Sequence, residues 1–167
     1  MSEKKQLSRS ELEIIIKKRA AIVVTLFAAL LAINTMIGGS NSSKVMGNTI
    51  AANNQWAWYQ AKNVRAGIYA TTADTTTDKK VADKYRAEAA RMKADMDEIA
   101  ANAKKLEAER ERASARSPFF TYAGAALQIG IVLSTAAILA VAMPLFWASV
   151  GAGSVGVVLF AYVQLGV

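Results

Sequence analysis

SPFFTYAGAALQIGIVLSTAAILAVAMPLFWASVGAGSVGVVLFAYVQLGV, residues 117–167, decides the fold of this chain. These 51 residues contain no Asp, Glu, Lys or Arg, whereas all 20 basic and 13 acidic residues lie between Glu3 and Arg116. An uncharged apolar run of this length suits about two bilayer crossings of roughly 20 residues each. Because only Met143-Pro144 divides the run clearly, we predict transmembrane helices over 117–143 and 144–167 that form a tight hairpin at Pro144. Ser117 and Pro118 are expected to start the first of them, as N-cap and first helical residue.

A third apolar segment near the N-terminus predicts another transmembrane helix over 20–39, closing at Gly38-Gly39. Its apolar run is longer than that of a usual secretory signal, so an uncleaved anchor is expected. The preceding tail, residues 1–19, is polar and basic and predicts a short interfacial helix. Two pairs in this tail fit the capping-box spacing, in which a hydroxyl and a carboxylate satisfy free backbone N–H groups: Ser8 with Glu11, and Ser10 with Glu13.

Residues 40–116 carry most of the charge and predict a water-exposed helical hairpin. In its second half, apolar residues recur at alternating steps of three and four, as at the a and d positions of a coiled coil: Ala82, Tyr85, Ala89, Met92, Met96, Ile99, Ala103 and Leu106. The first half has a looser pattern, through Met46, Ile50, Asn53, Ala57, Gln60 and Val64. A Thr-rich segment at 71–78 favours a turn between the halves. The expected fold is an all-α membrane protein with three transmembrane helices and a long extramembrane antiparallel helical hairpin.

The Lys and Arg distribution indicates the orientation of the spans. Six bases precede the first span, but Lys44 is the only one within 20 residues after Gly39. This asymmetry places the N-terminus in the cytoplasm and the hairpin and C-terminus outside. Five bases just before Ser117 oppose this assignment, but the charges of a long loop count for less.

The absent residue types bear on chemistry. The chain has no Cys and no His, which excludes thiolate nucleophiles, disulfides, typical zinc sites and His-based catalytic triads. The acidic residues of the hairpin are interleaved with Lys and Arg, so a solvated face is the simplest interpretation. We therefore predict no catalytic residue, no metal site, no cofactor and no enzyme activity. The net charge of +7 is assigned to anionic lipid headgroups rather than to nucleic acid.

Small residues recur in the two C-terminal spans. Gly151, Gly153 and Gly156 match G-x-G-x-x-G, but the match lies in an apolar segment and lacks the strand and acid of a dinucleotide site. Close helix packing is the better interpretation. The candidate packing residues, within the chain or between copies, are Ala126, Gly130, Ser134, Gly151, Gly153 and Gly156.

Asn34 and Gln128 are the principal polar side chains at the predicted membrane depth. Both can hydrogen-bond across helices, and neither ionises. Ion and proton pathways normally contain intramembrane acids or bases, and none occurs within the predicted spans. An active transporter is therefore disfavoured, whereas a passive pore lined by Ser, Thr and Asn in an oligomer stays open.

The stretch from Asn53 to Lys62 is the most unusual part of the hairpin because it places three large aromatic residues within four positions. Successive helical residues point about 100° apart, so the three rings cannot all face one partner helix. Three interpretations stay open: packing on the hairpin or at headgroups, a protein contact, and a small-molecule or lipid site. The candidate contact residues are Asn54, Gln55, Trp56, Trp58, Tyr59 and Lys62.

Two sequence words, GSNSSK at 39–44 and ANNQWAWYQAK at 52–62, together with the three apolar spans, resemble the bacterial domain-of-unknown-function family 4337. The resemblance covers most of the chain. It implies a multi-pass protein of the bacterial inner (cytoplasmic) membrane with this architecture, and it implies no reaction and no catalytic residues.

The sequence favours a non-catalytic structural or interaction protein of the membrane. We expect it to contact membrane lipid and to self-associate or serve as an accessory subunit of a larger membrane complex, through the hairpin and the small-residue faces of the spans. The alternative is a passive channel or transporter component formed by an oligomer.

Overall fold

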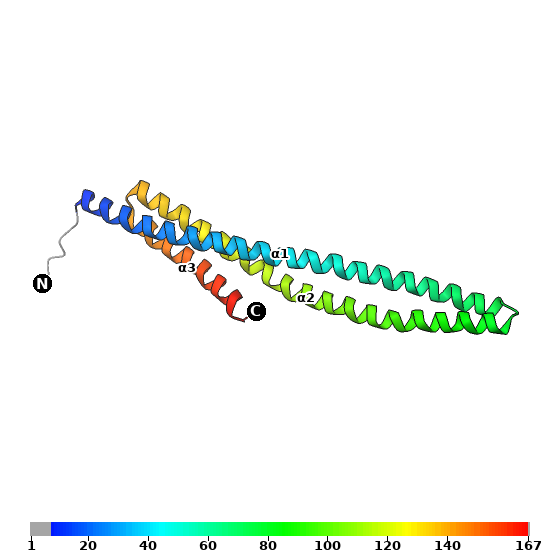
Figure 1. The fold of residues 1–167 in the computed structure, drawn as a ribbon. Helices are drawn as coiled ribbons and strands as arrows, with labels where there is room; N and C mark the ends of the chain where they lie inside the picture. The colour runs from blue at the N-terminus through cyan, green and yellow to red at the C-terminus, as the bar shows by residue number, and fades with distance from the viewer. Residues whose placement is uncertain (1–7, 167) are drawn as a thin grey trace. The chain divides into compact units, whose positions relative to one another are not determined.

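The computed structural model describes residues 8–166, which contain three α-helices and no strand. The expected all-α class is therefore confirmed for this part of the chain. Each helix contains a segment long and apolar enough to cross a membrane. The helices are α1 (Arg9–Thr75), α2 (Lys79–Ala140) and α3 (Met143–Gly166) (Figure 1).

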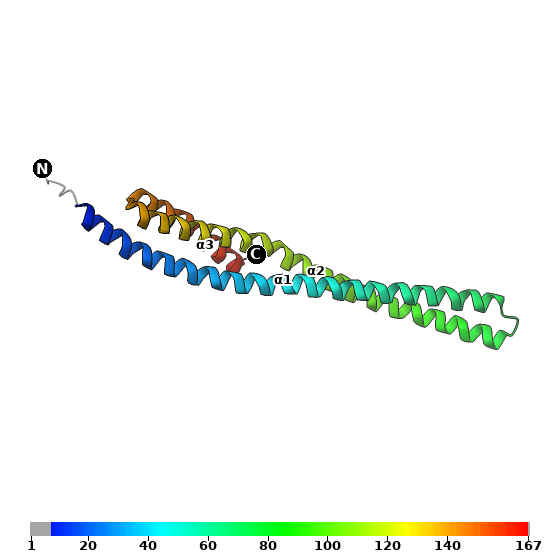
Figure 2. The ribbon, with the colours of Figure 1, turned by 90° about the horizontal axis from the view of Figure 1, so that it is seen from above.

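The chain divides into two compact units, and α1 and α2 contribute to both. We call Met1–Ser42 with Ala115–Val167 the span unit, and Ser43–Ser114 the hairpin unit. The span unit holds α3 and the adjoining parts of α1 and α2. The hairpin unit holds the end of α1 and the start of α2, which run side by side in opposite directions (Figures 1 and 2).

Helix α1 begins with one of the two predicted capping boxes. The Ser8 N–H donates to Glu11 Oε2 at 2.9 Å, and the Glu11 N–H donates to Ser8 Oγ at 3.3 Å. The bond from the Ser8 backbone lowers the pKa of Glu11 below its ordinary value. The second pair, Ser10 with Glu13, does not form a cap: Glu13 lies inside the helix and accepts from Lys17 Nζ. The tail predicted as a short interfacial helix over residues 1–19 is helical from Arg9, as the first part of α1, and residues 1–7 lie outside the described residues.

The first span is predicted to close at Gly38-Gly39, but α1 continues through both residues to Thr75, so no helix end lies there. Glycine inside a helix costs about 1 kcal/mol relative to alanine, which a packing contact can offset. Gly38 has such a contact: a Cβ at this position would lie 3.2 Å from Phe120 Cβ. Nothing lies within 4 Å of a Cβ built at Gly39.

The predicted helix start at Ser117-Pro118 is also wrong, because Pro118 lies inside α2. Proline in a helix interior removes one backbone donor and strains the preceding turn. The residues before it are mostly Ala, Glu and Arg, which are strong helix formers and carry the helix up to this point. The Thr121 hydroxyl donates to the Ser117 carbonyl at 3.3 Å in the turn that follows.

The turn between α2 and α3 lies at Val141-Ala142, not at Pro144 as predicted. Val141 has φ of 50°, and the Ala142 N–H donates to the Ala137 carbonyl at 3.2 Å. This is the Schellman ending of a helix, here with a β-branched residue in the left-handed position that glycine usually takes. Pro144 lies in the first turn of α3, where a missing N–H costs no helical bond.

Glycine contacts hold the three helices of the span unit together. A Cβ at Gly153 would lie 2.0 Å from the Phe27 ring, and one at Gly130 would lie 3.0 Å from the Gly153 Cα. The buried hydroxyls of Ser134 and Ser149 share a hydrogen bond of 2.8 Å between α2 and α3. A second apolar cluster forms where the start of α1 packs on the α2–α3 turn; its buried members are Ile16, Ala20, Ala137 and Phe146.

The hairpin unit turns at residues 76–78, within the predicted 71–78 segment. Asp78 caps α2, since its Oδ1 accepts from the Lys80 N–H at 2.8 Å. All eight predicted a and d positions of the second arm are buried or half-buried. The first arm meets them with a set of residues also at alternating steps of three and four, which we call the inner seam: Val45, Asn48, Ala52, Gln55, Tyr59, Lys62, Ala66, Tyr69 and Ala73.

The first arm is helical, as its looser pattern predicts, but all six residues of that pattern, from Met46 to Val64, are exposed. The reason is chemical: the inner seam contains alanines and polar side chains, so it is less apolar than the opposite face. Hydrophobic periodicity therefore identified the outer face of the helix instead of the packed one.

Candidate functional site

The structure separates the six aromatic-stretch candidates into an inward and an outward group. Trp56 is half-buried, and its Nε1–H donates to Glu107 Oε1 at 2.9 Å on the other arm. The rings of Trp56 and Tyr59 meet edge to face with centroids 5.6 Å apart. Lys62 Nζ donates a hydrogen bond to Asp95 Oδ2, and the two side chains form an ion pair. This hydrogen bond lowers the pKa of Asp95 below its ordinary value. These three side chains, with the half-buried Gln55, belong to the contact between the arms.

Asn54 and Trp58 form the outward group. Trp58 is 66% exposed, and both residues line a shallow hollow of about 290 Å³ with Gln55 and Ala57. An indole left outside the packed arms is a contact candidate, because tryptophan is enriched in the centres of protein interfaces.

A row of apolar residues continues along the same helix, on the face opposite the inner seam. We call it the outer stripe: Met46, Ile50, Ala57, Val64 and Ile68. The four large members are each more than half exposed. Their sequence steps of four, seven, seven and four keep them on one side of the helix. Isolated exposed apolar residues are ordinary, but exposed apolar residues that recur at a helical period indicate an interaction surface, here interrupted by the exposed Asn53 and Gln60.

The small-residue candidates of the spans lie mostly between helices of the same chain. Gly130, Ser134, Gly153 and Gly156 are buried; a Cβ at Gly156 would lie 2.8 Å from the Ala123 carbonyl oxygen. Ala126 is half-buried. Gly151 is exposed and has open space around it, so it does not take part in this packing.

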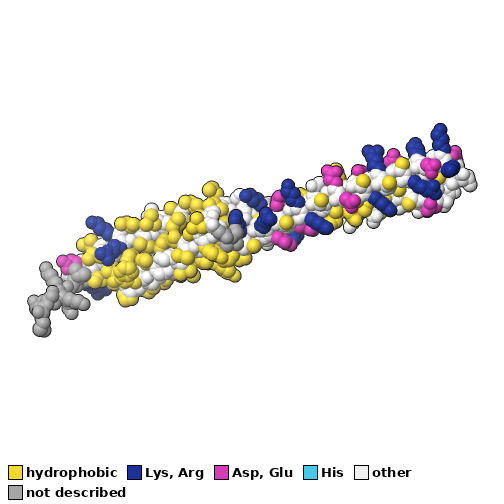
Figure 3. Space-filling model, turned by 90° about the horizontal axis from the view of Figure 1, so that it is seen from below, with side chains coloured by type: hydrophobic (Ala, Val, Ile, Leu, Met, Phe, Trp, Pro, Cys, Tyr) yellow, Lys and Arg dark blue, Asp and Glu magenta, His cyan; other side chains and the backbone are white. Residues whose placement is uncertain are grey.

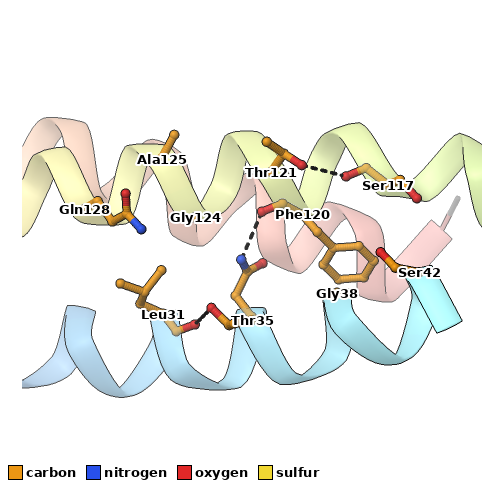
Figure 4. A pocket seen from close by; sticks show the side chains of 11 residues that line it. Leu31, Thr35, Gly38, Ser42, Ser117, Phe120, Thr121, Gly124, Ala125 and Gln128 are labelled. Atoms are coloured by element: carbon orange, nitrogen blue, oxygen red, sulfur yellow. Dashed lines mark hydrogen bonds between the residues drawn. The ribbon is translucent and has the colours of Figure 1, made fainter.

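Between α1 and α2, the span unit contains an open groove of about 400 Å³, which we call the span groove (Figure 4). Its lining combines small and apolar residues with hydroxyls and amides. The Thr35 hydroxyl donates to the Leu31 carbonyl, and the Thr121 hydroxyl donates to the Ser117 carbonyl. The lining residues are Leu31, Asn34, Thr35, Gly38, Ser42, Ser117, Phe120, Thr121, Gly124, Ala125 and Gln128.

Asn34 is the principal polar group of the span groove. It is 3% exposed, and its Nδ2 donates to the Phe120 carbonyl at 2.9 Å. Its Oδ1 has no hydrogen-bond partner among the described residues. A carbonyl can only accept, so the Phe120 contact fixes which end of the amide is the nitrogen. Within residues 8–166 this buried acceptor is therefore left without a donor.

Asn41 is a polar contact that the sequence interpretation missed. It is buried, and its Nδ2 donates to Ser117 Oγ at 3.1 Å. Asn41 follows Asn34 by seven residues, and Gly38 lies between them on the same face. That spacing was the available signal, since residues seven apart lie on one side of a helix.

Among residues 8–166 there is no group of three or more acidic residues positioned to hold a metal ion. The carboxylates that do form close contacts are paired with Lys, Arg or Trp side chains or with helix N-termini, as for Asp95, Glu107 and Glu11. These contacts are ion pairs, hydrogen bonds and helix caps; Arg86 contacts two carboxylates, Asp74 at 3.7 Å and Asp83 at 3.4 Å.

A family model described as "Domain of unknown function (DUF4337)" matches residues 16–166, nearly the whole chain. No curated protein and no solved structure matches the chain.

Proposed function

The chain belongs to the DUF4337 family, whose description assigns no activity, and we propose that it is a non-catalytic interaction protein of the membrane. In this proposal it self-associates or serves as an accessory subunit of a larger membrane complex. The observation that carries the proposal is the outer stripe, an unpartnered apolar face along one arm of the hairpin unit.

Lipid is the proposed solvent of the span unit. Its surface is apolar: Ile22, Leu139 and Leu165 are 63%, 81% and 87% exposed. Figure 3 shows hydrophobic side chains over this unit and interleaved charges over the hairpin unit. Apolar surface of this extent is unfavourable in water and favourable in hydrocarbon. We assign the chain to a bacterial cytoplasmic membrane, with the exposed Lys17, Lys18 and Arg19 on the cytoplasmic side and the hairpin in the periplasm.

The hairpin unit supplies the contact surface outside lipid. Its inner seam already packs against the second arm, so the outer stripe is free to receive another helix. An amphipathic helix docks through anchors at steps of three, four and seven residues, which is the spacing of Met46, Ile50, Ala57, Val64 and Ile68. Trp58 lies at the flank of this stripe and offers the largest single apolar contact.

Charge substitution in the outer stripe tests the proposal. The full chain, extracted in mild detergent and placed in nanodiscs, is expected to form an oligomer or to retain a co-purifying membrane subunit by native mass spectrometry. The double variant Ile50→Lys with Val64→Lys should weaken this association at least about tenfold, because docking would bury two ammonium groups. Trp58→Ala should weaken it as well.

The control is Asn63→Lys, which adds one positive charge, half that of the double variant, at the exposed neighbour of Val64. It should leave the association unchanged. If the wild-type chain is a lone monomer, or if the Ile50→Lys, Val64→Lys double variant associates as well as the wild type, the proposal is wrong.

The second candidate is a passive pore formed by an oligomer, which the polar lining of the span groove favours. Hydroxyls at Thr35, Ser42 and Thr121 lie along this groove. In this alternative, purified protein in planar bilayers should give discrete conductance, and Thr121→Val should reduce it. Absence of conductance from reconstituted oligomers would contradict the pore.

A further inference from the structure

We propose that the span groove is the contact between two copies of this chain, in which Gln128 of each copy donates a hydrogen bond to Asn34 Oδ1 of the other. The inference deepens the proposed function, on whose self-association and membrane embedding it rests. The span groove is a second surface, separate from the outer stripe, and its occupant is the same groove of a second copy.

Asn34 has a side-chain carbonyl oxygen that is buried without a hydrogen-bond donor in the described part of the chain. Its Oδ1 is inaccessible to solvent and has no partner within residues 8–166, while the nitrogen of the same amide is held by the Phe120 carbonyl. A buried amide oxygen without a donor costs free energy in any protein, and hydrocarbon contains no water to supply one. The side chain is one of the lining groups of the groove. In the proposed contact the Asn34 amide turns far enough to bring Oδ1 to a donor that enters the groove, which removes this cost.

Gln128 provides such a donor. It lines the same groove, its side chain is exposed, and it makes no hydrogen bond to any residue from 8 to 166. A primary amide facing lipid would be left with unpaired donors and an unpaired acceptor. Asn and Gln side chains in transmembrane helices meet this need by bonding across to a neighbouring helix.

The two groups lie at matching depth. A Cβ at Gly124 would lie 3.2 Å from Asn34 Nδ2, which places Asn34 at the level of Gly124. Gln128 follows Gly124 by one turn, about 6 Å along α2. Because helical side chains lean towards the N-terminus of their helix, the Gln128 amide extends back towards that level. Figure 4 shows Gln128 and Gly124 on α2 facing Leu31 and Thr35 on α1.

Symmetry then makes the contact reciprocal. All copies of a membrane protein insert with one orientation, so a two-fold axis between them runs along the membrane normal. Two facing grooves place each residue opposite its own level in the partner, and every contact occurs twice. Ala125 is small and exposed on the groove wall, which lets another helix approach. A lipid chain could fill the space but could not donate to Asn34.

Cysteine cross-linking tests the geometry, and the chain suits it because the wild type has no Cys. Thr121→Cys and Ala125→Cys place single thiols on the groove wall, one turn apart. In membranes containing the full-length protein, mild oxidation should convert both to disulfide-linked dimers. Tyr122→Cys and Ile129→Cys are the matched controls, since both residues are well exposed on α2 but lie outside the groove. They should give at least about tenfold less dimer.

Substitution of the donor tests the chemistry. Gln128→Leu keeps the side chain large and the span apolar but removes both reciprocal bonds. The dimer should dissociate about tenfold more readily, as two interhelical bonds of about 0.6–1 kcal/mol each imply. Ile129→Leu should have no such effect. Equal cross-linking at groove and control positions, or a Gln128→Leu dimer as tight as the wild type, would overturn the inference.

The cross-linking results distinguish association through the outer stripe from association through the span groove. If the outer stripe carries the association alone, Ile50→Lys with Val64→Lys abolishes the oligomer and the groove cysteines do not cross-link. If the groove carries it, those cysteines cross-link in the same double variant. A lipid or water in the groove would leave Gln128→Leu without effect on the association, which counts against the inference and leaves the outer stripe standing.

Discussion

The span unit and the hairpin unit use parts of the same two helices, α1 and α2, but hold them together by different chemistry. In the hairpin unit, the inner seam mixes alanines with larger and polar side chains, and Trp56 and Lys62 reach acidic partners on the other arm. In the span unit, Gly130, Gly153 and Gly156 bring backbones into contact, and amides and hydroxyls bond between helices.

This difference is the one expected between helices in water and helices in lipid. In water, burying apolar side chains drives association, so modest seams with solvated charges at their edges suffice. Lipid provides no such drive, and helices associate through close packing and hydrogen bonds instead. The change in packing along α1 and α2 therefore supports the membrane assignment independently of hydrophobic length.

The largest expected effect comes from adding one methyl group at the closest backbone contact. Gly156→Ala would place its Cβ 2.8 Å from the Ala123 carbonyl oxygen and 3.0 Å from the Leu127 nitrogen, so α2 and α3 must move apart. We expect a loss of about 1–3 kcal/mol in the free energy of unfolding. Unfolding in mixed micelles with increasing SDS, followed by circular dichroism, measures it.

Gly151→Ala is the control, because the same methyl group on the same helix meets open space. It should be neutral or stabilising by up to about 1 kcal/mol, since alanine is the better helix former. Equal destabilisation by the two substitutions would show that close packing does not distinguish these glycines.

The next effect lies in the hairpin unit. Trp56→Phe keeps most of the aromatic contact with Tyr59 but removes the Nε1 donor to Glu107. The expected cost is about 1 kcal/mol, typical of one half-buried hydrogen bond to a charged acceptor. Faster amide hydrogen exchange in both arms of the hairpin would report it. Trp58→Phe, at the exposed neighbouring indole, should leave exchange unchanged; similar changes in both variants would contradict the inward assignment of Trp56.

A smaller effect is expected for the pH dependence of the stability of the hairpin unit. The hydrogen bond from Lys62 lowers the pKa of Asp95 in the folded hairpin below its unfolded value. The ionised carboxylate therefore stabilises the fold above the unfolded pKa of about 3.9, and this contribution is lost as pH falls through the folded pKa. Hydrogen exchange of the hairpin should accelerate modestly between pH 5 and 3, after correction for intrinsic rates.

Asp95→Asn isolates this contribution. It should lower hairpin stability slightly at pH 7 and reduce its dependence on acid. Since Lys62 and Asp95 are partly exposed, salt should also weaken the wild-type pair. An unchanged acid response in Asp95→Asn would assign the effect to other carboxylates.

Sequence reasoning predicted elements better than it predicted their ends and faces. Apolar lengths gave the three membrane-compatible segments, and the heptad pattern gave the buried face of the second arm. It failed where the local preference of a residue did not decide its structure. Gly38 and Pro118 are helix breakers by propensity, yet each lies inside a long helix. In the first arm the most apolar side, which holds the outer stripe, is the one left unpacked, so the hydrophobic pattern alone does not identify the packed face.

The groove shows the same limit at a candidate site. Asn34 and Gln128 stand out in an apolar sequence, but their shared location needs the pairing of α1 with α2, which no local pattern encodes. The unpaired Asn34 oxygen is visible only once its nitrogen partner, the Phe120 carbonyl, is known. For both the shared location and the unpaired oxygen, the missing information was which residues of α1 lie next to which residues of α2.

The smallest predicted effect lies at the α2–α3 turn. Val141→Gly relieves the left-handed strain of a β-branched residue, about 1 kcal/mol, but loses a side chain that packs on the Phe146 cluster. The two changes nearly cancel, so SDS unfolding should shift by less than about 0.5 kcal/mol. Val150→Gly removes a side chain from the same cluster but lies inside α3, where glycine adds a helix penalty, and should cost about 2 kcal/mol. Equal costs at the two positions would mean that the turn stores no strain, and that packing alone holds α3 against the rest of the span unit.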